Sequence, residues 1–230
     1  MFAKFSIRAK IICLVSLLLL ALAGMGLLSA TSMRSLNAHT KEIANSWLPS
    51  IKALGELNVG AVYYRNVLNA HMLAETLEDK AVLEKTMAGI VENMTNVRKS
   101  YETMITSPEE RALYTEWSAR WQEYAGIAAK VLDLSRKEAG RLPREALQAN
   151  QQAIKVGNEA KAILAKDIEL NDRGAAQDTK AAEDTYSSIL MMLAAIVGLS
   201  ILAGAAVSFY VIRDVAAGIA SIVEPMQALG

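Results

Sequence analysis

The chain is poor in the residues that metal, redox and covalent chemistry require. It has 1 cysteine and 2 histidines among 230 residues. His39 and His71 have no neighbouring ligands at metal-binding spacing, and the sequence contains no HExxH pair, Gly-rich phosphate loop or GxSxG turn. Lone histidines in amphipathic helices are usually surface or packing residues. We therefore predict a protein that is not an enzyme, with no catalytic residues, no metal and no cofactor.

An excess of charge of one sign is also missing. The chain carries 24 Lys and Arg against 24 Asp and Glu, and residues 31–188 carry 20 against 22. A nucleic-acid partner would require a clustered basic face, so none is expected. Cys13 lies inside an apolar run, and the region beyond that run therefore depends on packing rather than on disulfides.

Two long uncharged apolar runs are present, at residues 11–30 and 189–212. A helix of about 18 or more apolar residues can cross the hydrocarbon core of a bilayer. Two spans place both termini on one side of the membrane and the intervening 158 residues on the other. A cleavable signal peptide is the alternative for the first run. Its apolar core would be only about 7–15 residues long, and SATSM is a poor cleavage site.

Basic residues indicate the orientation of these spans. Lys4, Arg8 and Lys10 precede the first run without an acid, which favours a cytoplasmic N-terminus. Arg213 follows the second run, although Asp214 weakens this half of the signal. The sequence thus predicts a multi-pass protein whose central region is exported.

Helix breakers divide the central region into four helices, and helix-forming residues dominate between them. Thr76 and Asp79 can cap a connection within residues 75–80. The run Ser107-Pro108-Glu109-Glu110 has the pattern of a capping box with a first-turn proline. Gly140 and Pro143 mark a third connection. We expect a first helix ending near residue 76, helices 80–106 and 108–139, and a fourth from residue 143 into the second span. Short connections make this an all-α, antiparallel four-helix bundle between two transmembrane helices.

The outer two helices are longer than the inner two, which predicts a homodimer. Residues 32–50 and the end of the fourth helix would lack cover from the inner helices, and a partner subunit would bury that apolar surface. In the same region Pro49 predicts a kink or a local restart of the helix. Trp47 lies too far from the apolar run to be an interfacial anchor, so we expect it to pack in the bundle.

A seven-residue stripe along the first helix places a charge on an apolar seam. Arg65 on this seam requires an acidic partner from another helix, a water-filled gap or an anionic ligand. Alternatively, a shift of the stripe by one residue places Arg65 outside the bundle. The stripe consists of Ile51, Leu54, Asn58, Ala61, Arg65, Leu68 and Met72.

If a ligand balances the charge of Arg65, the guanidinium group indicates the chemistry of that ligand. The planar guanidinium suits a carboxylate, and Tyr64, Asn58 and Asn69 would orient it by hydrogen bonds. A cluster on the third helix would form core or, alternatively, the wall of the same pocket. Arg136 is a second basic candidate nearer the distal connection. The cluster consists of Trp117, Arg120, Trp121 and Tyr124.

The whole layout resembles the N-terminal sensory half of a bacterial methyl-accepting chemotaxis protein with a four-helix-bundle sensor domain. Residues 218–229, GIASIVEPMQAL, resemble the opening helix of a HAMP relay, with Pro225, Met226 and Leu229 at matching positions. The resemblance implies the following organisation: cytoplasmic N-terminus 1–10, transmembrane helix 11–30, periplasmic sensor bundle 31–188, transmembrane helix 189–212, and a relay at 213–230 that begins with Arg213.

The family resemblance also implies a function and partners. Amino acids or organic acids bind between the subunits of such dimers, and an arginine comparable to Arg65 holds the carboxylate. Ligand occupancy would be converted into a small helix displacement across the bacterial inner membrane. The adaptation helices and the tip that contacts a kinase complex are not in this sequence, so the chain is expected to be a fragment or to have another output module.

Two alternatives differ in output. The same sensor could serve a histidine kinase or a cyclic-dinucleotide enzyme, or the chain could be a membrane-anchored structural protein. The residues encoded after residue 230 would distinguish these classes.

Overall fold

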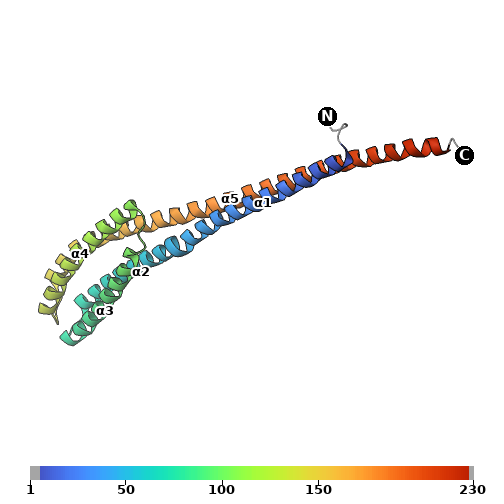
Figure 1. Ribbon diagram of the computed structural model, residues 1–230. Coiled ribbons are helices and arrows are strands. Elements are labelled where there is room, and N and C mark those ends of the chain that lie inside the picture. The colour runs from blue at the N-terminus through green and yellow to red at the C-terminus, as the bar shows by residue number, and fades with distance from the viewer. Residues whose placement is uncertain (1–5, 228–230) are drawn as a thin grey trace. The chain divides into compact units, whose positions relative to one another are not determined.

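The computed structural model describes residues 6–227, and every regular element in that range is helical (Figure 1). The fold class predicted from the sequence, an all-α four-helix bundle, is confirmed. The elements are α1 (Ile7–Glu42), a π-helical turn (Ile43–Trp47), α2 (Leu48–Leu73), α3 (Leu77–Glu102), α4 (Pro108–Lys137) and α5 (Arg144–Gln227).

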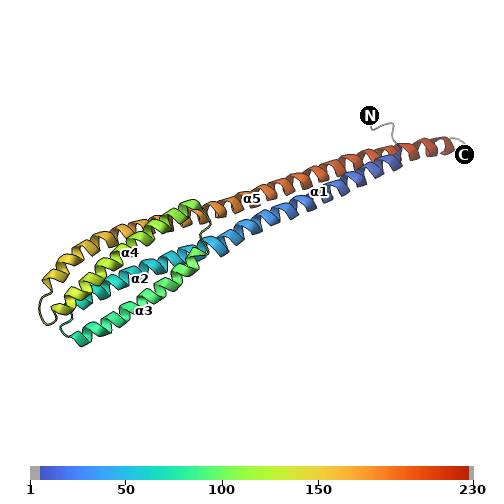
Figure 2. The same ribbon diagram turned by 60° about the vertical axis from the view of Figure 1, so that its left-hand side comes forward.

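The chain divides into two compact units. The bundle unit, Thr40–Thr179, contains α2, α3, α4 and the first part of α5, which lie side by side in Figure 2. The apolar unit comprises the described parts of Met1–His39 and Lys180–Gly230. The predicted sensor domain, residues 31–188, extends beyond the bundle unit at both ends.

Local capping explains where the inner helices begin. The Thr76 side chain accepts a hydrogen bond from the Asp79 backbone N–H at 3.1 Å, so α3 begins at Leu77, three residues before the predicted start. The Ser107 side chain accepts from the Glu110 backbone N–H at 3.1 Å, as a capping box requires. The Glu110 carboxylate departs from that motif, because it accepts from the backbone N–H of Thr106 rather than of Ser107.

The helix ends also have local causes. α3 ends at Glu102 rather than at residue 106, because residues 103–106 form the turn that enters the Ser107 cap. α4 ends at Lys137, and Gly140 adopts a left-handed φ of 75° in the following connection. A residue with a Cβ would be strained at that φ, so glycine suits this turn. Pro143 immediately precedes α5.

Pro49 changes the helix before it, as expected. Its missing N–H and its ring disrupt the hydrogen bond to the preceding turn, and residues 43–47 form a π-helical turn before α2 begins. Trp47, the last residue of this turn, donates from Nε1 to Asp178 Oδ2 at 2.7 Å. Its ring lies where a Cβ on Gly174 would fall 2.6 Å away. Trp47 therefore packs against α5 in the bundle unit.

The bundle core is built around a row of stacked aromatic rings on α4. Tyr114, Trp117, Trp121 and Tyr124 follow one another at helical spacing, with successive ring centroids 5.9, 6.3 and 5.4 Å apart. Tyr64 of α2 meets Trp121 edge-on at 5.6 Å. All five side chains are buried. Offset and edge-on rings are favourable beyond their buried area, so this row fixes the register of α4 against α2.

The apolar unit pairs α1 with the C-terminal part of α5. Both helices expose large hydrophobic side chains, and each contains an 18-residue window long and apolar enough to cross a membrane. Lys10 of α1 forms an ion pair with Asp214 of α5. This pairing accounts for the acid that follows Arg213 in the sequence.

Candidate functional site

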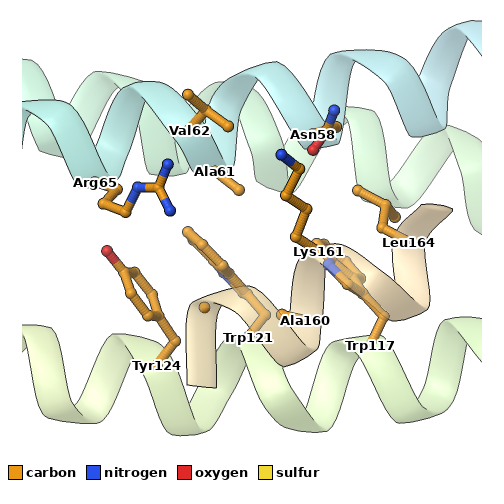
Figure 3. Close-up of a pocket in the computed structure, with 11 residues that line it drawn as sticks. Asn58, Ala61, Val62, Arg65, Trp117, Trp121, Tyr124, Ala160, Lys161 and Leu164 are labelled. Atoms are coloured by element: carbon orange, nitrogen blue, oxygen red, sulfur yellow. The ribbon is translucent and has the colours of Figure 1, made fainter. Parts of the chain in front are cut away.

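A small cleft lies between α2, α4 and α5 in the middle of the bundle unit (Figure 3). Its volume is about 30 Å³, enough for one or two water molecules. α2 contributes Asn58, Ala61, Val62 and Arg65; α4 contributes Trp117, Trp121 and Tyr124; and α5 contributes Gly157, Ala160, Lys161 and Leu164.

The cleft has two basic side chains and no acidic one among its lining residues. Arg65 Nη1 makes one long hydrogen bond, at 3.4 Å, to Asn158 Oδ1. Within residues 6–227 no carboxylate lies within ion-pairing distance of the Arg65 guanidinium. Lys161 enters from α5 beside Asn58 (Figure 3). The guanidinium has five N–H donors, so most of the hydrogen-bonding capacity of Arg65 is unused by protein groups.

Tyr124 adds an orphaned donor to the same cleft. Its side chain is 2% exposed, and its hydroxyl has no hydrogen-bond partner among the described residues. The hydroxyl points towards the Arg65 guanidinium in Figure 3. Burial raises the pKa of the Tyr124 phenol, which keeps it protonated. A buried polar group without a partner costs about 1–3 kcal/mol, so a water or ligand acceptor at this position would be stabilised.

Gly157 allows α5 to approach this tyrosine closely. A Cβ at Gly157 would lie 3.2 Å from the Tyr124 ring. Ala160 and Leu164 continue the same face of α5, and with Trp117 and Trp121 they form the apolar wall of the cleft. The site is therefore an apolar slot with unpaired hydrogen-bond donors, which suits an anion with an apolar portion.

The predicted site residues fall into two groups. Asn58, Arg65, Trp117, Trp121 and Tyr124 line the cleft. The remaining three lie outside it and have other contacts: Tyr64 packs on the Trp121 ring, Asn69 accepts from Asn150 Nδ2 at 3.2 Å, and Arg120 pairs with Glu123 and Glu159.

The cleft residues on α5 are not among the site residues predicted from the sequence. Gly157, Ala160 and Leu164 recur at helical spacing, and small residues in such a row indicate close approach of another helix. Lys161 stands next to this row and is the second cation of the cleft. The spacing of Gly157, Ala160 and Leu164 is the sequence feature that could have identified the α5 side of the cleft.

A second polar assembly, the distal network, lies at the bundle end that holds the α2–α3 and α4–α5 connections. The buried Lys80 donates from Nζ to the His71 carbonyl at 2.6 Å and to Ser135 Oγ at 2.9 Å. The two His71 ring nitrogens lie 3.0 Å from Ser135 Oγ and from Glu84 Oε1. Arg136 binds both Glu84 oxygens, at 2.7 and 2.9 Å. His71 is therefore a satisfied packing residue, and Arg136 is already paired.

The pKa shifts agree with a structural role for the distal network. Burial lowers the pKa of His71 and of Lys80. Hydrogen bonds, first from Arg136 and then from His71, lower the pKa of Glu84 to about 2. At neutral pH His71 is therefore uncharged, while Glu84 and Arg136 form a charged bidentate pair.

The sequence from residue 4 to residue 186 matches a family described as a four helix bundle sensory module for signal transduction. The chain belongs to this family. The resemblance noted in the sequence is thereby confirmed, and the bundle unit is the core of a chemotaxis-type sensory module. Its role is in signal transduction.

One relative of this sensory module comes from Bacillus subtilis (strain 168). The protein named "Putative sensory transducer protein YvaQ" is 22% identical to the chain over 212 residues. The match covers 92% of this chain and 36% of that protein, so the chain spans about a third of the relative's length. No solved structure matches the chain.

The predicted relay positions lie at the far end of α5. Arg213 is exposed on this helix, and the backbone of Pro225 and Met226 belongs to its last turns. Leu229 lies outside the described residues.

Proposed function

We propose that this sensory module is the ligand-binding region of a transmembrane chemoreceptor, which binds a small carboxylate in the α2–α4–α5 cleft and relays occupancy across a membrane. The observation that carries this proposal is that two hydrogen-bond donors with unused capacity, the Arg65 guanidinium and the Tyr124 hydroxyl, lie in one apolar slot. An amino acid or organic acid would supply the missing acceptors.

The size of the cleft supports a coupling between binding and displacement. A cavity of about 30 Å³ is much smaller than the roughly 300 Å³ of ordinary small-molecule sites. A ligand would therefore have to move α5 away from α2 and α4. Binding would favour the displaced arrangement and shift the population towards it.

α5 provides a route for that displacement. It is one helix of 84 residues, Arg144–Gln227, and it contains the cleft residues Gly157 and Lys161. Packed helices permit slides of about 1–2 Å, and a continuous helix transmits an axial slide along its length. The predicted relay positions Arg213, Pro225, Met226 and Leu229 follow on the same segment of the sequence.

Calorimetric titration tests the site. Purified 230-residue chain in lipid nanodiscs would be titrated with a panel of amino acids and organic acids. For any binder, we expect Arg65→Ala to weaken affinity at least about tenfold, because a charge-assisted bidentate contact is lost. Arg173→Ala, at an exposed arginine of α5, is the matched control and should leave affinity unchanged. Undiminished affinity in Arg65→Ala would show that the ligand binds elsewhere.

We also propose that the module is a homodimer that associates through α2. A mostly apolar groove between α2 and α3 is lined by Gly55, Val59, Gly60, Tyr63, Gly89 and Ile90, with Lys52, Glu56, Thr86 and Asn93 as its polar residues. Val59 is 68% exposed and Tyr63 is 52% exposed, and aromatic and aliphatic side chains at this level of exposure favour burial by a partner.

Disulfide cross-linking tests this surface. In a Cys13→Ser background, Val59→Cys should form a covalent dimer on mild oxidation. Ala112→Cys, on the exposed side of α4, should remain monomeric. Equal cross-linking at both positions would contradict an interface on α2.

For topology we propose a bacterial inner-membrane protein with both termini cytoplasmic and the bundle periplasmic. The two apolar helical windows and the basic residues around Arg8 support this arrangement. A reporter that is active only after export should work when fused at residue 140 and fail when fused at residue 230. Activity at both positions would exclude the hairpin topology. In a longer protein, a kinase complex would then receive the signal through the cytoplasmic end of α5.

A further inference from the structure

Four buried polar side chains meet at the proximal end of the bundle, which we define as the end that holds the α3–α4 connection. This carboxyl cluster consists of Tyr101 of α3, Glu110 of α4, and Asp167 and Asn171 of α5, each at most 2% exposed. None of the four lines the cleft. α5 continues from this cluster towards the apolar unit, so a change here acts on the helix proposed to carry the signal.

The carboxyl cluster is one hydrogen short. The Tyr101 hydroxyl oxygen lies 2.9 Å from Glu110 Oε1 and 3.0 Å from Asp167 Oδ2. A phenol has a single hydrogen, and ionised carboxylates only accept. With both acids ionised, one of these two short contacts would therefore hold no hydrogen. A proton on one carboxyl gives each of the two Tyr101 contacts a hydrogen.

The other donors indicate which acid holds that proton. Glu110 accepts from the Thr106 backbone N–H at 3.1 Å and from Asn171 Nδ2 at 3.3 Å. Apart from Tyr101, the Asp167 carboxylate receives only the same Asn171 group, at 3.4 Å. The ionised form of Glu110 is better solvated by protein donors. Asp167 is therefore the acid that donates to Tyr101, and Tyr101 donates to Glu110.

No cation balances the cluster. Among residues 6–227 no lysine, arginine or histidine is bonded to any of its members, and no side chain of α2 is bonded to it. The charged and titratable groups that face Asp167 are Tyr101 from α3 and Glu110 from α4. Burial and the Glu110 charge raise the pKa of Asp167 to about 7, against the opposing effect of the Tyr101 hydrogen bond.

We propose that Tyr101, Glu110 and Asp167 form a proton-dependent lock that joins α3, α4 and α5 when Asp167 is protonated and loosens when it ionises. Loss of the proton leaves two buried negative charges with one hydrogen between them. The external pH is then a second input to the module, independent of whether the cleft binds a carboxylate.

The sign of the stability effect follows from linkage. The pKa of Asp167 is 3.8 ordinarily and about 7 in the bundle, so the folded state holds more protons between these values. The contribution of Asp167 therefore stabilises the fold below this window, weakens as pH rises through it and is lost above about pH 7.

Infrared titration of the full chain in nanodiscs tests the lock. A protonated-carboxyl C=O band should disappear with a midpoint near pH 7 as the pH is raised. Asp167→Asn should remove that band. Asp172→Asn, at an exposed acid of the same helix, is the matched control and should retain it. A wild-type spectrum without a band that titrates near neutrality, or a band that persists in Asp167→Asn, would overturn the proposal.

A second variant keeps the proposal testable if Asp167→Asn does not fold. Tyr101→Phe removes the hydroxyl whose hydrogen bond lowers the pKa of Asp167. The midpoint should shift by about one pH unit, since the variant removes both the acceptor of the protonated Asp167 and the donor to its ionised form. An unchanged midpoint in Tyr101→Phe would show that the titrating acid is not in contact with Tyr101, which also overturns the lock.

Discussion

The two ends of the bundle bury similar numbers of polar groups but balance them differently. In the distal network Lys80, His71, Ser135, Glu84 and Arg136 match donors to acceptors, and the charges of both signs are present. In the carboxyl cluster at the proximal end two acids share one tyrosine hydrogen, and no cation from the described residues is bonded to them.

This difference indicates that the distal network stabilises the bundle, whereas the carboxyl cluster can respond to pH. A buried network with complete pairing is rigid and loses stability when any member is removed. A cluster with a proton deficit has two states of similar free energy near neutral pH, because one proton decides whether its hydrogen bonds are complete. The cleft between the two ends is a third case, with unpaired donors and no acid, and an anion would complete it.

Removal of the buried Lys80 from the distal network should destabilise the protein most. Lys80→Ala removes the donor to the His71 carbonyl and Ser135, and we expect a loss of about 3–5 kcal/mol in the free energy of unfolding. Thermal unfolding followed by circular dichroism in nanodiscs would measure it. Lys85→Ala, at an exposed lysine of α3, should cost less than about 0.5 kcal/mol. A similar small cost for both variants would contradict a structural role for Lys80.

Replacing one glutamate at each end by glutamine tests the difference between the two polar assemblies. Glu84→Gln should destabilise the bundle by about 1–2 kcal/mol, because the charged pair with Arg136 and the bond to His71 are weakened. Glu110→Gln at pH 8 should be neutral or stabilising, because it removes one of two like charges around Tyr101. A larger loss in Glu110→Gln than in Glu84→Gln would reverse our assignment of the two ends.

The pH dependence of stability should have opposite signs at the two ends. His71 has a lowered pKa, so the folded state releases its proton more readily and stability falls as pH drops below about 6.5. Asp167 acts in the other direction between 3.8 and about 7. In Asp167→Asn, the free energy of unfolding should therefore rise more steeply between about pH 5 and pH 7 than in wild type, by an amount on the order of 1 kcal/mol. Parallel pH profiles for the two proteins would exclude a contribution from Asp167.

The smallest effect tests steric contact at the proximal end. Gly174→Ala places a Cβ 2.6 Å from the Trp47 ring, and we expect a cost of about 1 kcal/mol after the gain in helix propensity is subtracted. Gly126→Ala has no atom within 4 Å and should stabilise α4 by about 0.5–1 kcal/mol. Thermal unfolding would compare the two variants. If both stabilise the protein, the Trp47 ring moves aside without a measurable loss of stability.

Features written in adjacent residues were predictable. Thr76 and Ser107 cap helices through their own side chains, Gly140 supplies a left-handed turn, and Pro49 disrupts the turn before it. The two uncharged runs likewise identify the membrane candidates by length alone. Each of these effects depends on residues no more than a few positions apart, so a single sequence contains the whole interaction.

The α5 side of the cleft, the distal network and the carboxyl cluster could not be predicted from neighbouring residues. Helical periodicity predicts Arg65 and Tyr124, but Lys161 and Gly157 join them only through the register of α5 against α2 and α4. Tyr101 and Asp167 are 66 residues apart, and their meeting depends on how three helices slide and rotate against one another. Local hydrogen bonds and helical spacing set which residues form helices and which face of each helix is apolar, so both can be predicted from a single sequence. Which polar groups on those faces share protons depends on cross-helix distances of a few ångströms. Packing of the whole core sets these distances, so the partners are known only from the folded bundle.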